Sequence, residues 1–160
     1  MLTDYTTYAD IRGALGVSQE DITDAVLSLT LYEDGLIQDL EDVDTTIPDT
    51  YQATAELETP TATETRFLRA CRQFATLSVA QKLTAAMPLF AAKQMTDGKA
   101  QVSRFDNPYR DVVAGVMSQY AAARTRLKET FDALGTLSAT VTPKVYFSSF
   151  SPSVDAVTGT

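Results

Sequence analysis

The chain contains no histidine. The side chains that remain as candidates for chemistry are carboxylates, one thiol and a row of arginines. Without histidine there is no histidine general base, no Ser-His-Asp or Cys-His nucleophile and no histidine-ligated metal. The acidic run over residues 39–44 invites a calcium interpretation. The EF-hand template started at Asp42 fails, because Ile47 replaces the required glycine and Ala53 the required glutamate. We therefore expect a solvated helix face here, with no metal and no cofactor.

The remaining reactive groups also favour a structural role. Carboxylate pairs such as Asp21 with Asp24 occur in every globular domain, and nothing marks a buried pair with divided pKa values. Cys71, the single cysteine, lies on an apolar helical stripe, where an inert buried residue is the default. The sequence contains no phosphate-binding loop, dinucleotide fingerprint or nucleophile elbow. The protein is therefore expected not to be an enzyme, and a carboxylate enzyme is the remote alternative.

A row of three arginines is the main basic feature. Arg66, Arg69 and Arg72 stand at helical spacing on one face, where they could contact phosphate. The acidic residues just upstream are Glu56, Glu58 and Glu64. Together with the net charge of −8, these acids favour salt bridges over phosphate contacts, either within the chain or to a neighbouring subunit.

The composition limits the broad class of the protein. The 160 residues, of which 44% are hydrophobic, predict one compact domain over residues 1–135 and an extended tail over residues 136–160. Domains that grip nucleic acid are normally basic, whereas this chain has 13 Lys and Arg against 21 Asp and Glu. One cysteine excludes an internal disulfide, and neither a signal peptide nor a membrane span is recognisable. We expect a soluble intracellular or virion protein.

Short helices are expected in the N-terminal third. A helical stripe over residues 8–15 is followed by Gly16, a typical C-terminal cap. Ser18 with Asp21 forms a capping-box pattern, which predicts that a second helix begins at Ser18. A third helix is expected over residues 29–43, whose apolar positions recur at steps of three and four.

A long surface loop is expected over residues 44–63, which are rich in threonine and show no period. A long helix follows. Thr61 with Glu64 is a second capping-box pattern and predicts its start, although Thr59 as N-cap before Pro60 at the first position fits nearly as well. Its wide apolar band marks it as the central helix. Pro88 should kink or end this helix.

A second long helix closes the domain. Asn107 and Pro108 fit its N-cap and first position, and Gly135 is expected to end it. Its apolar stripe consists of Val113, Val116, Tyr120, Leu127, Phe131 and Leu134. The elements together predict an all-α fold, a small helical bundle with two long helices, short N-terminal helices and an extended C-terminal tail.

The C-terminal tail contains a strand-like segment over residues 144–150 with large apolar side chains on both faces. A strand of this kind needs burial on both faces. It either folds back on its own domain or is donated to another chain by strand addition.

The N-terminal third has an order of residues that is similar to a known family. This order runs through YADIRGALGVS at residues 8–18, DAVLSL at 24–29 and LY at 31–32. It resembles the head–tail adaptor (head-completion or connector) proteins of tailed bacteriophages, most clearly over residues 5–45. The resemblance implies an all-helical subunit of a twelve-membered ring beneath the portal, where the ring prolongs the DNA channel and offers a landing surface for tail proteins.

The implied partners are the portal protein, a downstream tail or stopper protein and further copies of the chain, with no membrane. DNA would pass through without sequence-specific binding, and the location would be the neck of the virion after synthesis in the bacterial cytoplasm. The candidate portal-docking residues are Lys144, Val145, Tyr146, Phe147 and Phe150. The candidate inter-subunit or tail-side contacts are Thr46, Ile47, Pro48 and Tyr51, with inter-subunit salt bridges from Arg66, Arg69 and Arg72.

Two other functions stay open. One is a different neck or tail-completion component such as a stopper, a class that is usually β-rich. The other is a small acidic helical binding or regulatory protein, whose tail would be ordered on its own domain.

Overall fold

The computed structural model describes residues 1–84 and 108–138 of the chain. These residues form seven helices and no strand. The helices are α1 (Leu2–Tyr5), α2 (Tyr8–Leu15), α3 (Asp24–Leu27), α4 (Thr30–Glu41), α5 (Ile47–Ala55), α6 (Ala62–Thr84) and α8 (Pro108–Ser138). The expected all-α architecture of short N-terminal helices and two long helices is confirmed. The expected break at Pro88 and the segment at residues 144–150 lie outside the described residues.

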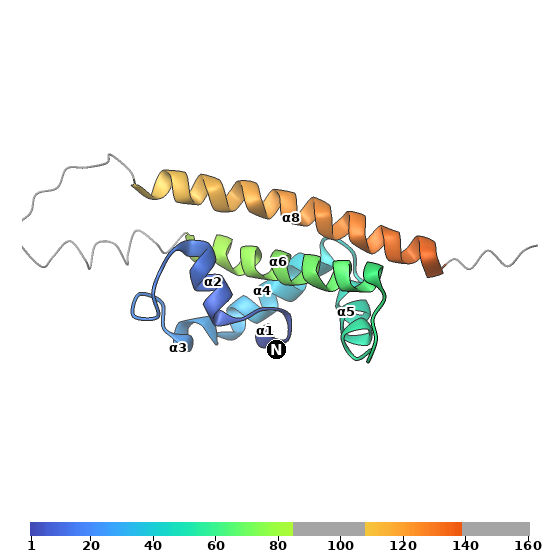
Figure 1. Ribbon diagram of the computed structural model, residues 1–160. Coiled ribbons are helices and arrows are strands. Elements are labelled where there is room, and N and C mark those ends of the chain that lie inside the picture. The colour runs from blue at the N-terminus through green and yellow to red at the C-terminus, as the bar shows by residue number, and fades with distance from the viewer. Residues whose placement is uncertain (85–107, 139–160) are drawn as a thin grey trace, which may run out of the picture.

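Helix α6 is the centre of the molecule. Figure 1 shows the N-terminal helices on one side of α6 and α8 along the other. Phe67, Phe74 and Leu83 of α6 are completely buried. The helix contacts α1, α2, α4 and α5 on one side and α8 on the other. Its apolar band is wide because it packs against both layers. The prediction of a central helix is confirmed.

The start of α6 also follows the sequence pattern. The backbone N–H of Thr61 donates to Glu64 Oε2 at 2.6 Å, and the backbone N–H of Glu64 donates to Thr61 Oγ1 at 3.3 Å. The two residues thus satisfy each other's backbone donors, which is the capping box. The hydrogen bonds from Thr61 also hold the pKa of the Glu64 carboxyl below its ordinary value.

The connection from α2 to α3 is partly as expected. Gly16 ends α2 in the left-handed conformation, at φ 68°, which glycine adopts without strain. Ser18 and Asp21 do form their mutual hydrogen bonds. They close only a single turn, so the prediction of a helix beginning at Ser18 is wrong. The carbonyl of Ile22 accepts from the Arg12 side chain at 2.7 Å, and the next helix begins at Asp24.

The stretch over residues 44–63 is not a long loop, because α5 lies within it. Pro48 stands in the first turn of α5, where its missing N–H breaks no helical hydrogen bond. Ile47, Tyr51 and Thr54 recur at helical spacing and are buried against the core. The side-chain hydroxyls of Thr50 and Thr54 donate to backbone carbonyls one turn earlier, so neither hydroxyl is left without a partner.

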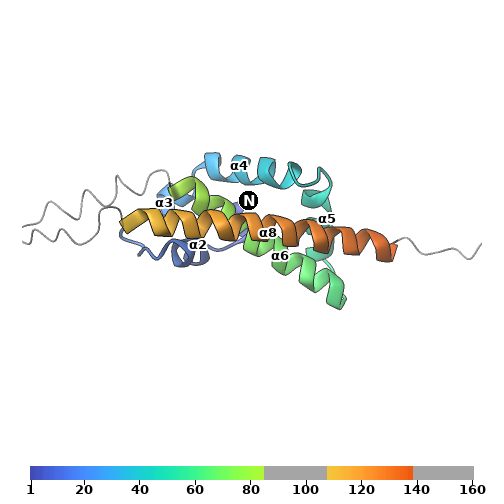
Figure 2. The same cartoon turned by 90° about the horizontal axis from the view of Figure 1, so that it is seen from above.

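Helix α8 packs along α6 with one face. Its backbone begins at Pro108 as expected, whereas Asn107 lies outside the described residues. The helix continues to Ser138, so the prediction that Gly135 ends it is wrong. The predicted apolar stripe is confirmed as the packed face, since its members are buried or partly buried. Figure 2, which looks down on α8, shows the helix lying across the length of α6.

The N-terminal layer contains a stacked pair of tyrosines with unequal hydrogen bonding. The ring centroids of Tyr5 and Tyr51 lie 4.4 Å apart. The Tyr51 hydroxyl donates to the backbone oxygen of Asp4 at 2.7 Å. The Tyr5 hydroxyl is buried and has no hydrogen-bond partner among the described residues. Burial raises the pKa of Tyr5 to about 12.

The pair provides a matched test of the packing. Tyr5→Phe removes a buried hydroxyl without a partner, so the free energy of unfolding should rise by up to about 1 kcal/mol. Tyr51→Phe leaves the Asp4 carbonyl without its donor and should lower the free energy of unfolding by about 1 kcal/mol. Urea unfolding at neutral pH measures both, and equal losses in the two variants would contradict the assignment.

The Tyr5→Phe variant also tests the raised pKa of Tyr5 through the pH dependence of stability. Because the Tyr5 pKa is raised from 10.0 to about 12, the folded chain keeps a proton that the unfolded chain releases. The contribution of this proton to stability is complete below pH 10.0 and declines as the pH rises to about 12. Wild type should therefore lose more stability than Tyr5→Phe over this interval.

Candidate functional site

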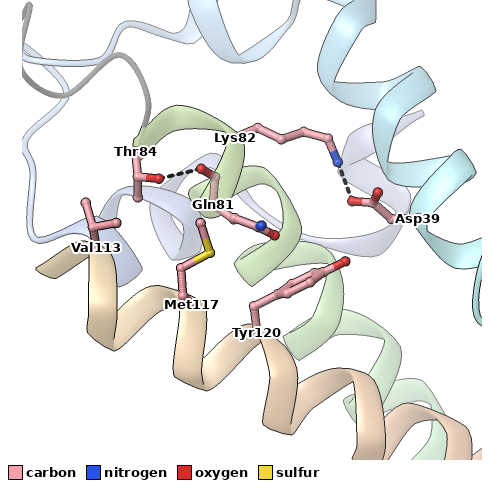
Figure 3. Close-up of a pocket in the computed structure, with 7 residues that line it drawn as sticks. All are labelled: Asp39, Gln81, Lys82, Thr84, Val113, Met117 and Tyr120. Carbon is pink, nitrogen blue, oxygen red and sulfur yellow. Dashed lines mark hydrogen bonds and ion pairs between the residues drawn. The ribbon is translucent and has the colours of Figure 1, made fainter.

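Among the clefts in the described part of the chain, two bring together polar side chains from three helices. The first lies between α4, α6 and α8 and has a volume of about 430 Å³. Figure 3 shows its lining residues, which are Asp39, Gln81, Lys82, Thr84, Val113, Met117 and Tyr120. It brings together the Asp39 carboxylate, the Lys82 ammonium group and the Tyr120 phenol, which are groups that can take part in acid-base chemistry.

The charged groups of this first cleft are fully occupied with one another. The three N–H donors of Lys82 reach the Asp39 carboxylate, the Ser78 hydroxyl at 3.2 Å and the Gly35 carbonyl at 3.1 Å. Ser78 is completely buried and itself donates to the same Asp39 oxygen. A Cβ on Gly35 would lie 2.8 Å from Lys82 Cε, so glycine allows this close approach. The network ties α4 to α6.

Two other reactive side chains belong to the core. Tyr120 stacks on Phe74 with ring centroids 5.3 Å apart, and burial raises the pKa of its phenol. Cys71 is completely buried, and burial raises the pKa of its thiol, which makes it inert. Among residues 1–84 and 108–138 no group of three metal-ligating side chains comes together.

The second cleft contains two of the three predicted arginines. It lies between α2, α6 and α8 and has a volume of about 460 Å³. Its lining residues are Asp10, Ala14, Arg69, Arg72, Gln73, Thr76, Leu77 and Gln119, and we call it the arginine groove. Arg66, Arg69 and Arg72 are exposed, and none pairs with a carboxylate in the described part of the chain.

A third guanidinium lies at the edge of the arginine groove. Arg126 of α8 donates to Gln73 Oε1 at 3.0 Å and is itself exposed. The only carboxylate that lines the groove belongs to Asp10, an exposed residue of the first turn of α2. The groove is therefore positively charged and open to a partner.

The charges of the chain are divided strongly between its two parts. Residues 1–59 contain fourteen acidic residues and one basic residue, a formal charge of −13, whereas the rest of the chain carries +5. Some of the basic residues neutralise the acidic layer. Lys128 lies 3.7 Å from the Asp44 carboxylate, and Arg124 donates to the Asp42 carbonyl at 3.2 Å. Arg69 and Arg72 of the groove take no part in this pairing among the described residues.

The predicted contact residues of the segment 44–63 are not all available. Ile47 and Tyr51 are core residues, which corrects the expectation that they contact a partner. Thr46 is exposed, but its hydroxyl and backbone N–H both donate to the Asp44 carboxylate. Pro48 is half-buried. The portal-docking candidates at residues 144–150 lie outside the described residues.

A clasp between α2 and α3 was not foreseen from the sequence. Arg12 is 9% exposed, and its guanidinium donates to the Ile22 carbonyl and to the Asp24 carboxylate. Asp24 therefore neutralises Arg12 and does not act with Asp21, which bonds to Ser18. The signal available in the sequence was a lone arginine in the acidic N-terminal part, but its partner is set by the fold.

Comparisons with known proteins give no family for the chain. No protein-family model, no curated protein and no solved structure matches it. No helix in the described part of the chain has the length and apolar composition needed to span a membrane. The function therefore has to be inferred from the geometry above and from the resemblance of residues 5–45.

The Asp39–Lys82 network should behave as a structural tie. Asp39→Leu or Lys82→Met alone leaves the other charge without its partner and should lower the free energy of unfolding by about 1–3 kcal/mol. The double variant should lose clearly less than the sum of the two, because no unpaired charge remains. Urea unfolding of the four proteins measures this coupling, and strictly additive losses would contradict it.

Proposed function

We propose that the protein is a structural head–tail adaptor subunit of a tailed bacteriophage. It forms a ring under the portal, prolongs the DNA channel and provides the surface on which the tail attaches. Its partners are the portal protein, a downstream tail or stopper protein and further copies of itself, in the neck of the virion.

The observation that carries the proposal is where the residues of the resemblance lie. Residues 8–18 form α2 and its glycine cap, and residues 24–32 form α3 and the start of α4. Ile11, Leu15 and Leu27 of these segments are buried in the core, and the Arg12–Asp24 clasp joins them. The similar residues are thus those that determine the shape of the N-terminal layer, so the resemblance concerns the fold of this layer.

The charge distribution supports the same function. A channel that DNA slides through has to avoid binding phosphates, and an acidic surface repels them. The charge of −13 over residues 1–59 is suited to that requirement.

The alternatives are less well supported. A stopper or tail-completion protein of the usual β-rich kind would contain strands, and residues 1–84 and 108–138 contain none. A small acidic helical regulator is compatible with the fold and differs in being absent from virus particles.

Particle composition tests the proposal. In purified particles of the phage that encodes this chain, quantitative mass spectrometry should find it at a copy number near that of the portal subunit. The reason is that a ring stacked on the portal shares its symmetry. Absence of the chain from particles would reject the adaptor function and favour the regulator.

The C-terminal tail is expected to dock on the portal. Deleting residues 141–160 should leave a folded helical domain, measured by circular dichroism, but abolish binding to purified portal protein. A variant with Tyr146→Ser, Phe147→Ser and Phe150→Ser keeps the length of the tail and should lose binding to a similar extent. Retained binding in both variants would exclude docking through the tail.

A further inference from the structure

The arginine groove combines charge with an apolar floor. Arg69 and Arg72 are exposed and lack acidic partners among the described residues, while Ala14 of α2 and the buried Leu77 of α6 are apolar residues that line the groove. Arg126 adds a third guanidinium at the edge. A fitting occupant therefore carries two carboxylates with an apolar side chain close by.

The same chain exposes a segment of this composition. In the turn between α5 and α6, Leu57 is 46% exposed and is flanked by the exposed Glu56 and Glu58. Neither glutamate forms an ion pair with another described residue. The turn thus presents an apolar side chain between two carboxylates, which is the combination that complements the arginine groove.

The spacings of the two sets of charges also agree. Side chains three residues apart on a helix, such as Arg69 and Arg72, have Cβ atoms about 5–6 Å apart. Glu56 is the C-cap of α5 in the right-handed helical conformation, and its Cα atom lies at most about 7 Å from that of Glu58, two residues farther on. The two carboxylates are therefore close enough for each to pair with one arginine, and Leu57 between them supplies the apolar side chain.

The turn cannot fill the groove of its own molecule. The turn precedes the first residue of α6, whereas Arg72 stands about 15 Å farther along that helix. Figure 1 shows α5 and its connection to α6 toward one end of the molecule and α2 toward the other. A contact between turn and groove must join two molecules through different surfaces.

We propose that the arginine groove binds the Glu56–Glu58 turn of a second copy of this chain. The interface is heterologous, because each copy binds one neighbour with its turn and the other neighbour with its groove. The same contact is therefore repeated from copy to copy until the ring closes. The proposal deepens the adaptor function, on which it rests for its biological setting. The proposal assigns Arg69 and Arg72 to salt bridges between copies. Binding of phosphate groups by these arginines is the alternative that the experiment below distinguishes.

Charge reversal in the full-length chain tests the interface. Wild type should associate as its concentration rises from about 10 µM to about 1 mM at low salt, and less so in about 500 mM NaCl. Arg69→Glu with Arg72→Glu, the groove variant, should weaken association at least about tenfold, as should Glu56→Arg with Glu58→Arg, the turn variant. Sedimentation velocity measures the mass in each case. Wild type that stays monomeric over this range would overturn the proposal.

Mixing the two variants is the decisive step. The groove variant keeps a normal turn and the turn variant keeps a normal groove, and the reversed turn is again opposite in charge to the reversed groove, so an equal mixture should regain association that neither variant shows alone. Native mass spectrometry identifies the mixed species, which contain both variants. A mixture that stays monomeric although both variants are folded would overturn the proposal, as would larger assemblies in either variant alone.

Matched controls separate this contact from general charge effects. Arg110→Glu and, separately, Glu20→Arg with Asp34→Arg change exposed charges elsewhere and should associate as wild type does. If the groove variant associates normally but no longer binds a labelled DNA oligonucleotide that wild type binds, the groove is a phosphate site and the proposal fails. The copy number of the chain in virus particles does not depend on these results. The proposed interface and the proposed adaptor function are therefore tested separately.

Discussion

The structure depends on the burial of α6 between two layers. Phe67 and Phe74 are completely buried, and they pack against Phe131 and Tyr120 of α8 with ring centroids 5.9 and 5.3 Å apart. The opposite side of α6 meets the N-terminal helices. Aromatic pairs of this size supply much of the apolar area that a small domain can bury. Among the described residues, the flank of α6 that carries Arg66, Arg69 and Arg72 is exposed, so the position of the groove follows from the packing.

The same packing explains how the charges are used. The N-terminal layer is strongly acidic, and it is held to α6 and α8 by cations that those helices extend toward it. Lys82 forms an ion pair with Asp39, and Lys128 forms one with Asp44. Within the layer, Arg12 pairs with Asp24 and holds the α2–α3 connection. These groups have structural partners, so what the molecule offers to other molecules is its surface: an acidic layer, an arginine groove and an exposed acidic turn.

Features with a local cause could be predicted from the sequence. Gly16 and the Thr61–Glu64 capping box depend only on neighbouring residues, and both took the expected geometry. The Ser18–Asp21 box also formed, but the Arg12 side chain takes the Ile22 carbonyl and limits the helix to one turn. That competition depends on the tertiary structure, and no local pattern indicates it.

Other features needed the fold. Helix α5 was missed because its threonines and Pro48 have low helix propensity, although Ile47, Tyr51 and Thr54 already stood at helical spacing. The Asp39–Lys82 pair joins residues 43 positions apart, which composition and spacing cannot reveal. The arginine row was noticed in the sequence, but its groove exists only because α2 and α8 flank α6.

The proposed adaptor function can be tested by cryo-electron microscopy of the neck of the virus particle. An adaptor is expected there as a ring of this helical subunit beneath the portal, with Arg69 and Arg72 of each copy against Glu56 and Glu58 of the next. A neck without this subunit, or a ring in which those arginines face the DNA, would contradict it.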